Sequence, residues 1–474
     1  MFPVMTKLDD VATWLERRLP ELIAEHDVPA AAVAAGVNGD VVEVAAGLLS
    51  RSTGVAATTD SVFQIGSITK VWTATLVMQL VEQGELEMDA PLRRYLPDFQ
   101  VADEHAAGSI TVRQLLSHTA GFEGDIFTDT GPGDDALEKY VAQLDDVAQL
   151  FPPGERFSYN NAGYCVLGRL VEVVRGASYD ECLRSRLFAP LQLTHAATSA
   201  AEAILFRAAV GHVRPSPQDE QQSAPVWSMG RSNAPAGSIL AMSARDLVRF
   251  AQVHLDGGTA ADGTRVLRSD TVEGMQQRQV ELPGLRVMGD AWGLGWEVYD
   301  TPGETVIGHD GSTLGQASFL RMVPARGVAV ALLTNGGEGY PLYRDVIGHL
   351  LAELADAELP PLPQPPADPP RVDASRYVGT YSSRVADLVV EQDEDGRIWR
   401  AIRPKGEMAE LGEAPSRAEL VAYEDGMLIA RVAEHGLHMP HAFVGDDGAG
   451  HARYLHIGRV MPRASAERST TAST

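Results

Sequence analysis

The chain has 474 residues, of which 45% are hydrophobic and 22% charged, and its formal net charge is −25. This length exceeds that of a typical domain of about 100 to 250 residues, so we expect a large globular domain followed by a smaller one. The negative charge argues against nucleic acid and anionic membrane surfaces as partners, because both attract clustered Lys and Arg.

The N-terminal segment predicts a helix rather than an export signal. Leu8, Val11, Leu15, Leu19 and Leu22 recur at helical spacing among acidic residues, whereas a signal peptide is basic and then continuously apolar. The sequence has no apolar run long enough to cross a membrane. We therefore expect a cytoplasmic protein with no membrane association.

Strands and helices then come in runs. Residues 29–49 predict a β-hairpin, because Asn38-Gly39 suits a tight turn with two positive φ angles. An apolar helix starts at Ser67 and ends near Gly84, and helical patterns continue to about residue 210. Strands follow from about residue 286, and a last helix ends near residue 358. This order predicts an α+β core with an antiparallel sheet, helices that flank it and a helical subdomain.

A proline-rich linker separates this core from a second domain. We assign residues 1–358 to a catalytic domain and residues 359–371 to the linker, where prolines favour an extended path. Residues 372–463 read as short strands joined by Asp-Gly turns, which predicts a small β-barrel. The polar end, 464–474, is expected to be disordered.

The sequence predicts neither a metal nor a cofactor. Cys165 and Cys182 lie in apolar helical surroundings, which indicates buried free thiols. No C-x-x-C or H-E-x-x-H motif is present, and the 13 histidines are scattered along the chain.

The stretch FQIGSITKVWTA, residues 63–74, contains a candidate catalytic pair. Residues three apart share one helix face, so Lys70 can reach Ser67, and the Ser67 N–H can stabilise an oxyanion. A serine three residues before a lysine is common by chance. However, the chain has only four lysines among 39 basic residues, and Lys70 is embedded among apolar residues, where an ammonium is costly. Lys70 can act as the base when neutral, or its charge can lower the pKa of a second base.

Residues 157–164, FSYNNAGY, offer that second base. Tyr159 and Asn161 lie two apart and are expected on one side of an extended loop. Asn161 can orient Lys70 and donate to a substrate carbonyl. Core packing is the alternative role for this tyrosine.

Residues 308–315, GHDGSTLG, supply a third candidate group. In a strand His309 and Gly311 share one face and Asp310 the other. Gly311 lets a substrate backbone approach, and the Ser312 N–H can be a second oxyanion donor. A structural or surface histidine is the alternative.

Together these motifs resemble those of the penicillin-recognising serine enzymes, particularly class C β-lactamases and DD-peptidases. The motifs are Ser67-x-x-Lys70, Tyr159-x-Asn161 and His309-x-Gly311. Residues 89–99, 110–122 and 292–298 support the resemblance, which covers about residues 8–355. It implies a β-lactamase/penicillin-binding-protein-like core.

The resemblance also implies roles for these residues. Ser67 is the acylated nucleophile, Lys70 and Tyr159 are the general acid/base pair, and the N–H groups of Ser67 and Ser312 form the oxyanion hole. Class C β-lactamases have Lys-Thr-Gly where this chain has His309-Asp310-Gly311. A mostly neutral histidine is a weaker anion site, so efficient β-lactam turnover is not expected.

The linker and the C-terminal domain resemble those of penicillin-binding-protein-type thioesterases, which release and cyclise nonribosomal peptides and carry a lipocalin-like domain. This implies acyl transfer from a peptidyl thioester or ester with a D-configured end to an amine. The substrate is then a small molecule or a peptidyl chain that a carrier protein can present. A D-amino-acid-specific peptidase or amidase and a carboxylesterase are the alternatives. A β-lactamase and an acylated sensor without turnover fit less well.

Arginines of the C-terminal domain can cover the active site and bind substrate. We select Arg453 as a substrate-binding residue and note Arg459 as a second candidate; solvated surface positions are the alternative for both.

Overall fold

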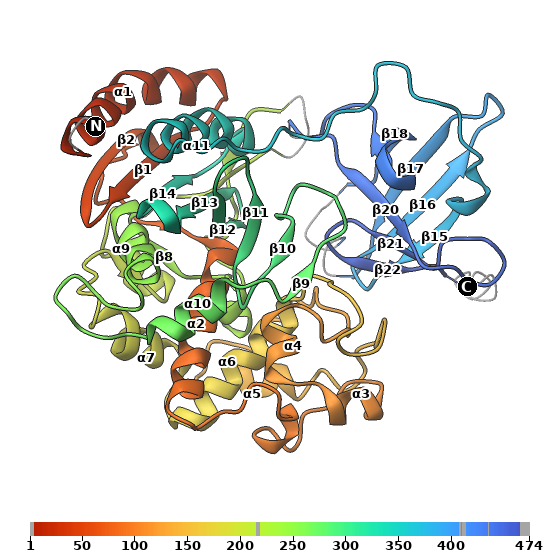
Figure 1. The fold of residues 1–474 in the computed structure, drawn as a ribbon, viewed down its shortest axis with the longest axis horizontal. Helices are drawn as coiled ribbons and strands as arrows, with labels where there is room; N and C mark the ends of the chain where they lie inside the picture. The colour runs from red at the N-terminus through yellow and green to blue at the C-terminus, as the bar shows by residue number, and fades with distance from the viewer. Residues whose placement is uncertain (1–3, 215–218, 407–408, 410–413, 435, 465–474) are drawn as a thin grey trace.

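The computed structural model describes residues 4–214, 219–406, 409, 414–434 and 436–464 (Figure 1). Among these residues, none of the helices combines the length and the apolar character that a bilayer crossing demands. The tail expected to be disordered, 464–474, lies outside the described residues except for Ala464.

A nine-stranded antiparallel sheet forms the centre of the N-terminal part, in the order β3-β2-β1-β14-β13-β12-β11-β10-β9. The predicted hairpin is confirmed as β1 and β2, where Val37 pairs with Asp40 and both turn residues, Asn38 and Gly39, have positive φ. The strands are β1 (Ala30–Val37), β2 (Asp40–Ser50), β3 (Val55–Ala56), β9 (Val280–Glu281), β10 (Ala291–Trp292), β11 (Glu297–Asp300), β12 (Thr305–Thr313), β13 (Gln316–Val323) and β14 (Val328–Thr334).

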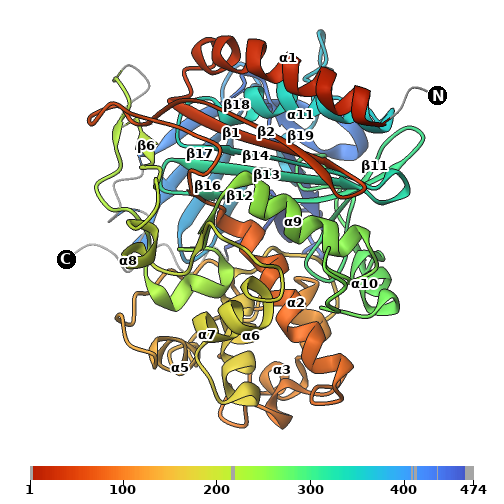
Figure 2. The same cartoon turned by 90° about the vertical axis from the view of Figure 1, so that its left-hand side faces the viewer.

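Helices cover both faces of this sheet, as Figure 2 shows. Helices α1 (Val4–Glu25) and α11 (Gly339–Ala355) pack on one face, and α9 (Ala244–Leu255) packs on the other. A hydrophobic core lies on each face of the sheet, because successive side chains of β1 point to opposite faces. Val33 packs in the core with α1 and α11, and Ala34 packs in the core that contains α9. The predicted α+β class is confirmed.

A helical region lies beside the α9 face of the sheet (Figure 1). Its central helix, α2, is buried on nearly every side from Thr69 to Leu80, and Gly84 follows its end with φ +73°, as predicted. The helices here are α2 (Thr69–Glu82), α3 (Glu104–Ser109), α4 (Val112–Leu116), α5 (Ala136–Val141), α6 (Asn161–Arg175), α7 (Tyr179–Leu183), α8 (Ala200–Ala203) and α10 (Ser269–Gln276). Short strands β4 (Phe63–Gln64), β8 (Ala241–Met242) and β5 (Ala196–Ala197) form a small sheet, and β6 (His212–Val213) pairs with β7 (Gln222–Ser223).

The C-terminal part is a barrel-like antiparallel sheet of eight strands in sequential order. A bridge between Tyr381 and Arg463 joins its first and last parts, so the sheet is nearly closed, as the sequence predicted. Residues 356–373, all described, contain no helix or strand. The strands are β15 (Gly379–Ser382), β16 (Ala386–Gln392), β17 (Ile398–Pro404), β18 (Ser416–Ala422), β19 (Leu428–Ala430), β20 (Pro440–Val444), β21 (Tyr454–His456) and β22 (Val460–Pro462).

Candidate active site

Ser67 lies on the 3₁₀ turn Gly66–Ile68 that leads into α2. Gly66 has φ +51°, and a β-carbon on it would lie 2.5 Å from the Ser312 backbone nitrogen. Only glycine therefore allows the turn to approach β12 this closely. This contact brings the Ser312 amide to the entrance of the helix that carries Ser67.

Lys70 is fully buried one helical turn after Ser67. Its Nζ lies 3.0 Å from Ser67 Oγ and donates to the Ala236 carbonyl at 2.6 Å. Burial lowers the pKa of Lys70 to about 7, because an ammonium loses hydration in this site. The Ala236 carbonyl can only accept, so it binds one N–H of the Lys70 amine. When the amine is neutral, its lone pair remains free to face Ser67.

Tyr159 completes a compact group with these two residues. It is 5% exposed and lies near Ser67, and Lys70 Nζ lies 4.7 Å from the centre of its ring. Burial raises the pKa of Tyr159 above its usual value, although the nearby Ser67 hydroxyl opposes this shift. The two pKa shifts favour an amine on Lys70 that loses its proton near pH 7 and a phenol on Tyr159 that keeps its proton.

Asn161 is the first residue of α6 and not part of an extended loop, because Asn160 caps that helix by accepting from Gly163 N. The Asn161 amide donates to Asp125 Oδ1 at 2.7 Å. The other Asp125 oxygen pairs with Arg459 of the barrel. Asn161 is thus tied to the barrel through Asp125, instead of serving Lys70 as expected.

His309 lies on β12 beside Tyr159, with the two ring centres 6.4 Å apart. Burial lowers the pKa of His309 to about 3, and the nearby Lys70 adds to this shift. Its Nδ1 lies 2.6 Å from the Asp310 carbonyl oxygen, which can only accept, so Nδ1 carries the proton and Nε2 is the free acceptor. Near neutral pH this position therefore supplies no cation.

The predicted alternation along β12 places Asp310 on the opposite face from His309. Asp310 accepts from Arg321 at 2.6 Å, and the Arg321 guanidinium lies over the rings of Tyr299 and Tyr343. Burial raises the pKa of Asp310 to about 6, while Arg321 opposes this shift. Tyr343 belongs to α11, so this ion pair stabilises the sheet on the face away from Ser67.

Gly311 is required for packing rather than only for substrate approach. A β-carbon at this position would lie 2.0 Å from the Ile65 carbonyl oxygen and 2.5 Å from Ser318 Oγ. Any other residue would push β12 away from the segment before Ser67. Gly311 therefore keeps the Ser312 amide close to Ser67.

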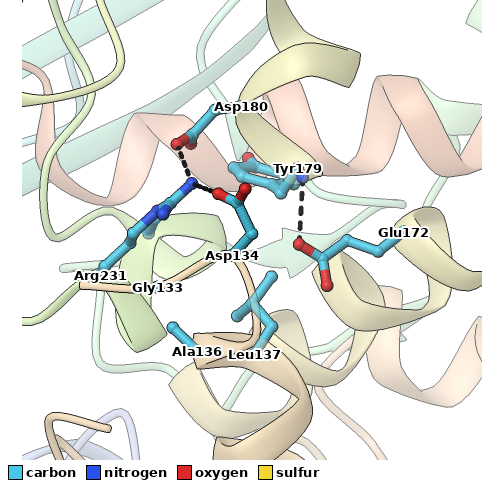
Figure 3. Close-up of a pocket in the computed structure, with 9 residues that line it drawn as sticks. Gly133, Asp134, Ala136, Leu137, Glu172, Tyr179, Asp180 and Arg231 are labelled. Carbon is cyan, nitrogen blue, oxygen red and sulfur yellow. Dashed lines mark hydrogen bonds and ion pairs between the residues drawn. The ribbon is translucent and has the colours of Figure 1, made fainter. Parts of the chain in front are cut away.

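The segment Arg231–Ala236 fixes the carbonyl that holds Lys70. Tyr179 donates to Thr73, and Thr73 donates to the Pro235 carbonyl at 2.8 Å. At the other end of the segment Arg231 bonds two carboxylates, of Asp134 and Asp180 (Figure 3). The pocket drawn in Figure 3 is lined in part by Arg231 and Ala234 of this segment and by none of the predicted site residues.

His118 packs against Tyr159 and bonds to the residues beside it. Its Nδ1 accepts from Asn160 N at 2.9 Å, its carbonyl accepts from Ser158 N, and its ring centre lies 4.4 Å from that of Tyr159. Burial lowers the pKa of His118 well below its usual value, so the ring is neutral.

The two barrel arginines differ in position. Arg453 is exposed and its guanidinium lies 5.2 Å from the Tyr454 ring, whereas that of Arg459 lies 4.9 Å from the Tyr159 ring. The structure therefore brings Arg459 to the site and leaves Arg453, the residue that we selected, on the barrel surface.

Sequence reasoning missed several residues around the site, namely His118, Asp125 and the segment Arg231–Ala236. His118 lies inside the stretch 110–122 that supported the family resemblance, so that stretch was a usable signal. Asp125 and Ala236 had no such signal, because their roles depend on contacts between residues far apart in the chain.

Comparisons with known proteins show which sequences and folds this chain is similar to. The profile of the family described as Beta-lactamase matches residues 15–353. Penicillin-binding protein 4 of Amycolatopsis lactamdurans is 48% identical over 374 residues, which are 78% of this chain and 97% of that protein. The crystal structure of SurE is 32% identical and covers 98% of this chain and 100% of its own, with a TM-score of 0.78; a second SurE structure contains D-Leu. The octameric penicillin-binding protein homologue from Pyrococcus abyssi shares the fold over 95% of this chain and 99% of its own, at 23% identity and a TM-score of 0.63.

Proposed function

Because the chain belongs to the β-lactamase family of serine enzymes, we propose that it is an acyltransferase that forms an acyl-enzyme on Ser67 and passes the acyl group to an amine. The acyl donor is a peptidyl thioester or ester whose last residue has the D configuration. When the amine belongs to the same chain, the product is a macrocyclic peptide. A carrier protein can present the donor.

The observation that carries the proposal is the buried Lys70 amine at 3.0 Å from Ser67 Oγ, with a pKa that burial lowers to about 7. Lys70 takes the Ser67 proton as Oγ attacks the acyl carbon. Tyr159 lies near the same Oγ, so its hydroxyl can give a proton to the departing thiolate or alkoxide and regain one from Lys70. In the second half the amine attacks the acyl carbon, its proton leaves through the same groups, and Oγ is protonated again.

Two observations support a peptidyl donor with a D-configured end. The likeness to SurE extends over 98% of this chain, including the barrel, and a SurE structure contains D-Leu. In addition, a cavity of about 340 Å³ begins at Ile126, next to Asp125, and extends to Arg384 of the barrel. This volume falls in the usual range for ligand sites, about 300 to 1,000 Å³, and offers room for the remote part of a peptide.

Hydrolysis is the second candidate, because Ser67 is only partly buried and water can reach its acyl-enzyme. The enzyme would then be a D-amino-acid-specific peptidase or amidase, or a carboxylesterase. The neutral His309 disfavours efficient β-lactamase activity, since a β-lactam carboxylate gains no cation at this position.

Product analysis separates these functions. The enzyme is incubated with N-acetylcysteamine thioesters of one linear peptide with a free N-terminus that ends in D-Leu or in L-Leu. Acyl transfer predicts a product of peptide mass minus one water from the D-Leu substrate, and hydrolysis predicts the linear acid. Equal processing of both configurations would contradict the preference for a D residue.

A further inference from the structure

The β21–β22 turn of the barrel binds the three residues that end in Tyr159. His456 Nε2 lies 2.9 Å from the Phe157 carbonyl oxygen, and Val460 N donates to Ser158 Oγ at 3.1 Å. The Gly458 carbonyl accepts from Tyr159 N at 3.1 Å. Each residue from 157 to 159 therefore has one hydrogen bond to the barrel, which covers the segment directly before α6.

The bonds of His456 define its tautomer. The Phe157 carbonyl only accepts, so Nε2 carries the proton, and Nδ1 accepts from Gly458 N at 3.1 Å. The ring is 3% exposed, and burial lowers the pKa of His456 to about 4, with Arg156 adding to this shift. Neutral His456 therefore connects the two domains: its Nδ1 binds Gly458 of the turn, and its Nε2 binds Phe157 of the catalytic domain.

The turn and the tyrosine segment also have close contacts within the core. Gly458 has φ +90°, and a β-carbon on it would lie 2.7 Å from Met288 Sδ. On the opposite side of the tyrosine segment, the His118 carbonyl accepts from Ser158 N. The segment that ends in Tyr159 therefore has hydrogen bonds both to His118 of the core and to the barrel turn.

We propose that His456 is a positioning residue for Tyr159: by joining Gly458 to Phe157 it holds the tyrosine hydroxyl at the distance from Ser67 that proton transfer requires. This inference rests on the proposed acyl-enzyme function and gives the barrel a part in the chemical step. A displacement of about 1 Å can reduce a rate by about 100-fold, so a small movement of this segment is enough to impair catalysis.

Two esters with different leaving groups test this role of His456. An ethyl ester of N-acetyl-D-leucine needs a proton on its alkoxide, whereas p-nitrophenolate leaves without one. His456→Leu should slow Ser67 acylation by the ethyl ester about 100-fold, the lower range for loss of general acid catalysis, and change the p-nitrophenyl ester rate far less. His456→Gln keeps a donor toward Phe157 and should restore most of the ethyl ester rate. Equal loss on both esters, or no loss on either, would overturn the proposal.

His441→Leu is the matched control. This histidine is also buried in the barrel, and its Nδ1 bonds the Met439 carbonyl of the same domain. The His441→Leu variant should leave the ratio of the ethyl ester rate to the p-nitrophenyl ester rate unchanged. If His441→Leu changes the ratio as much as His456→Leu does, the effect comes from barrel stability and the proposal fails.

Ser158→Ala offers a test that leaves the barrel sequence intact, should His456→Leu not fold. It removes the acceptor of Val460 N and should lower the ethyl ester rate selectively, though less than His456→Leu. An unchanged ratio would count against the proposal. If the wild-type protein releases neither alcohol faster than Ser67→Ala, the proposed function fails and this inference fails with it.

Discussion

Replacement of Lys70 by methionine should stabilise the protein in a pH-dependent manner. Burial lowers the pKa of Lys70 from 10.5 to about 7, which corresponds to about 5 kcal/mol at about 1.4 kcal/mol per unit. Below pH 7 both the folded and the unfolded chain carry this proton, so the folded state bears the whole cost of a buried ammonium. Methionine has a similar length and no charge, and it removes that cost.

The sign of the pH dependence follows from proton linkage. Between pH 7 and about pH 10 the folded lysine is neutral while the unfolded lysine still holds its proton, so the unfolding free energy of the wild type rises with pH. The advantage of Lys70→Met should therefore be largest at pH 6 and shrink by several kcal/mol toward pH 10. In Lys70→Met, Ser67 and Ala236 lose a hydrogen-bond partner at every pH. This loss shifts the unfolding free energy by the same amount at each pH and does not change its slope.

Denaturant unfolding at a series of pH values measures this difference. Lys139→Met is the matched control, because Lys139 is exposed and pairs with Asp135 on the surface. Its difference from the wild type should stay within about 1 kcal/mol at every pH. A Lys70→Met curve parallel to that of the wild type would refute a depressed pKa for Lys70.

Three further outcomes follow from the site. The rate of Ser67 acylation should rise with pH with a midpoint near 7, because the base is neutral Lys70; a pH–rate profile with a midpoint near 10 would contradict this. Lys70→Arg should lower the acylation rate about 1,000-fold in stopped-flow assays, since arginine keeps the charge but cannot accept a proton; retained activity would mean that charge alone suffices. Benzylpenicillin should give a long-lived adduct in intact-mass spectra, because His309 is neutral, and rapid turnover would be the contrary result.

The motifs could be predicted from sequence because their spacing is local. Ser67 and Lys70 share one helix face by periodicity, and His309 and Asp310 occupy opposite faces of one strand by alternation. The proline-rich segment and the Asp-Gly turns likewise indicated a β domain after the core. In each case a short stretch of chain determines the geometry.

The surroundings of these motifs could not be predicted in the same way. The pKa of Lys70 depends on burial by several elements, and the Ala236 carbonyl comes from a segment 166 residues further along the chain. Arg459 and Arg453 could not be distinguished, because which of them faces Tyr159 depends on how the barrel lies against the core. Asn161 begins a helix and not a loop because Asn160 caps α6, and a cap depends on a side-chain bond that residue spacing alone does not indicate.

The proposed chemistry requires that Ser67 carries the acyl group. Peptide mapping by mass spectrometry after rapid acid quench of the enzyme with the D-Leu peptidyl thioester measures this. The peptide that contains Ser67 should gain a mass equal to the acyl group, and Ser67→Ala should give neither adduct nor product. Product formation by Ser67→Ala at the wild-type rate, or an adduct on another residue, would contradict it.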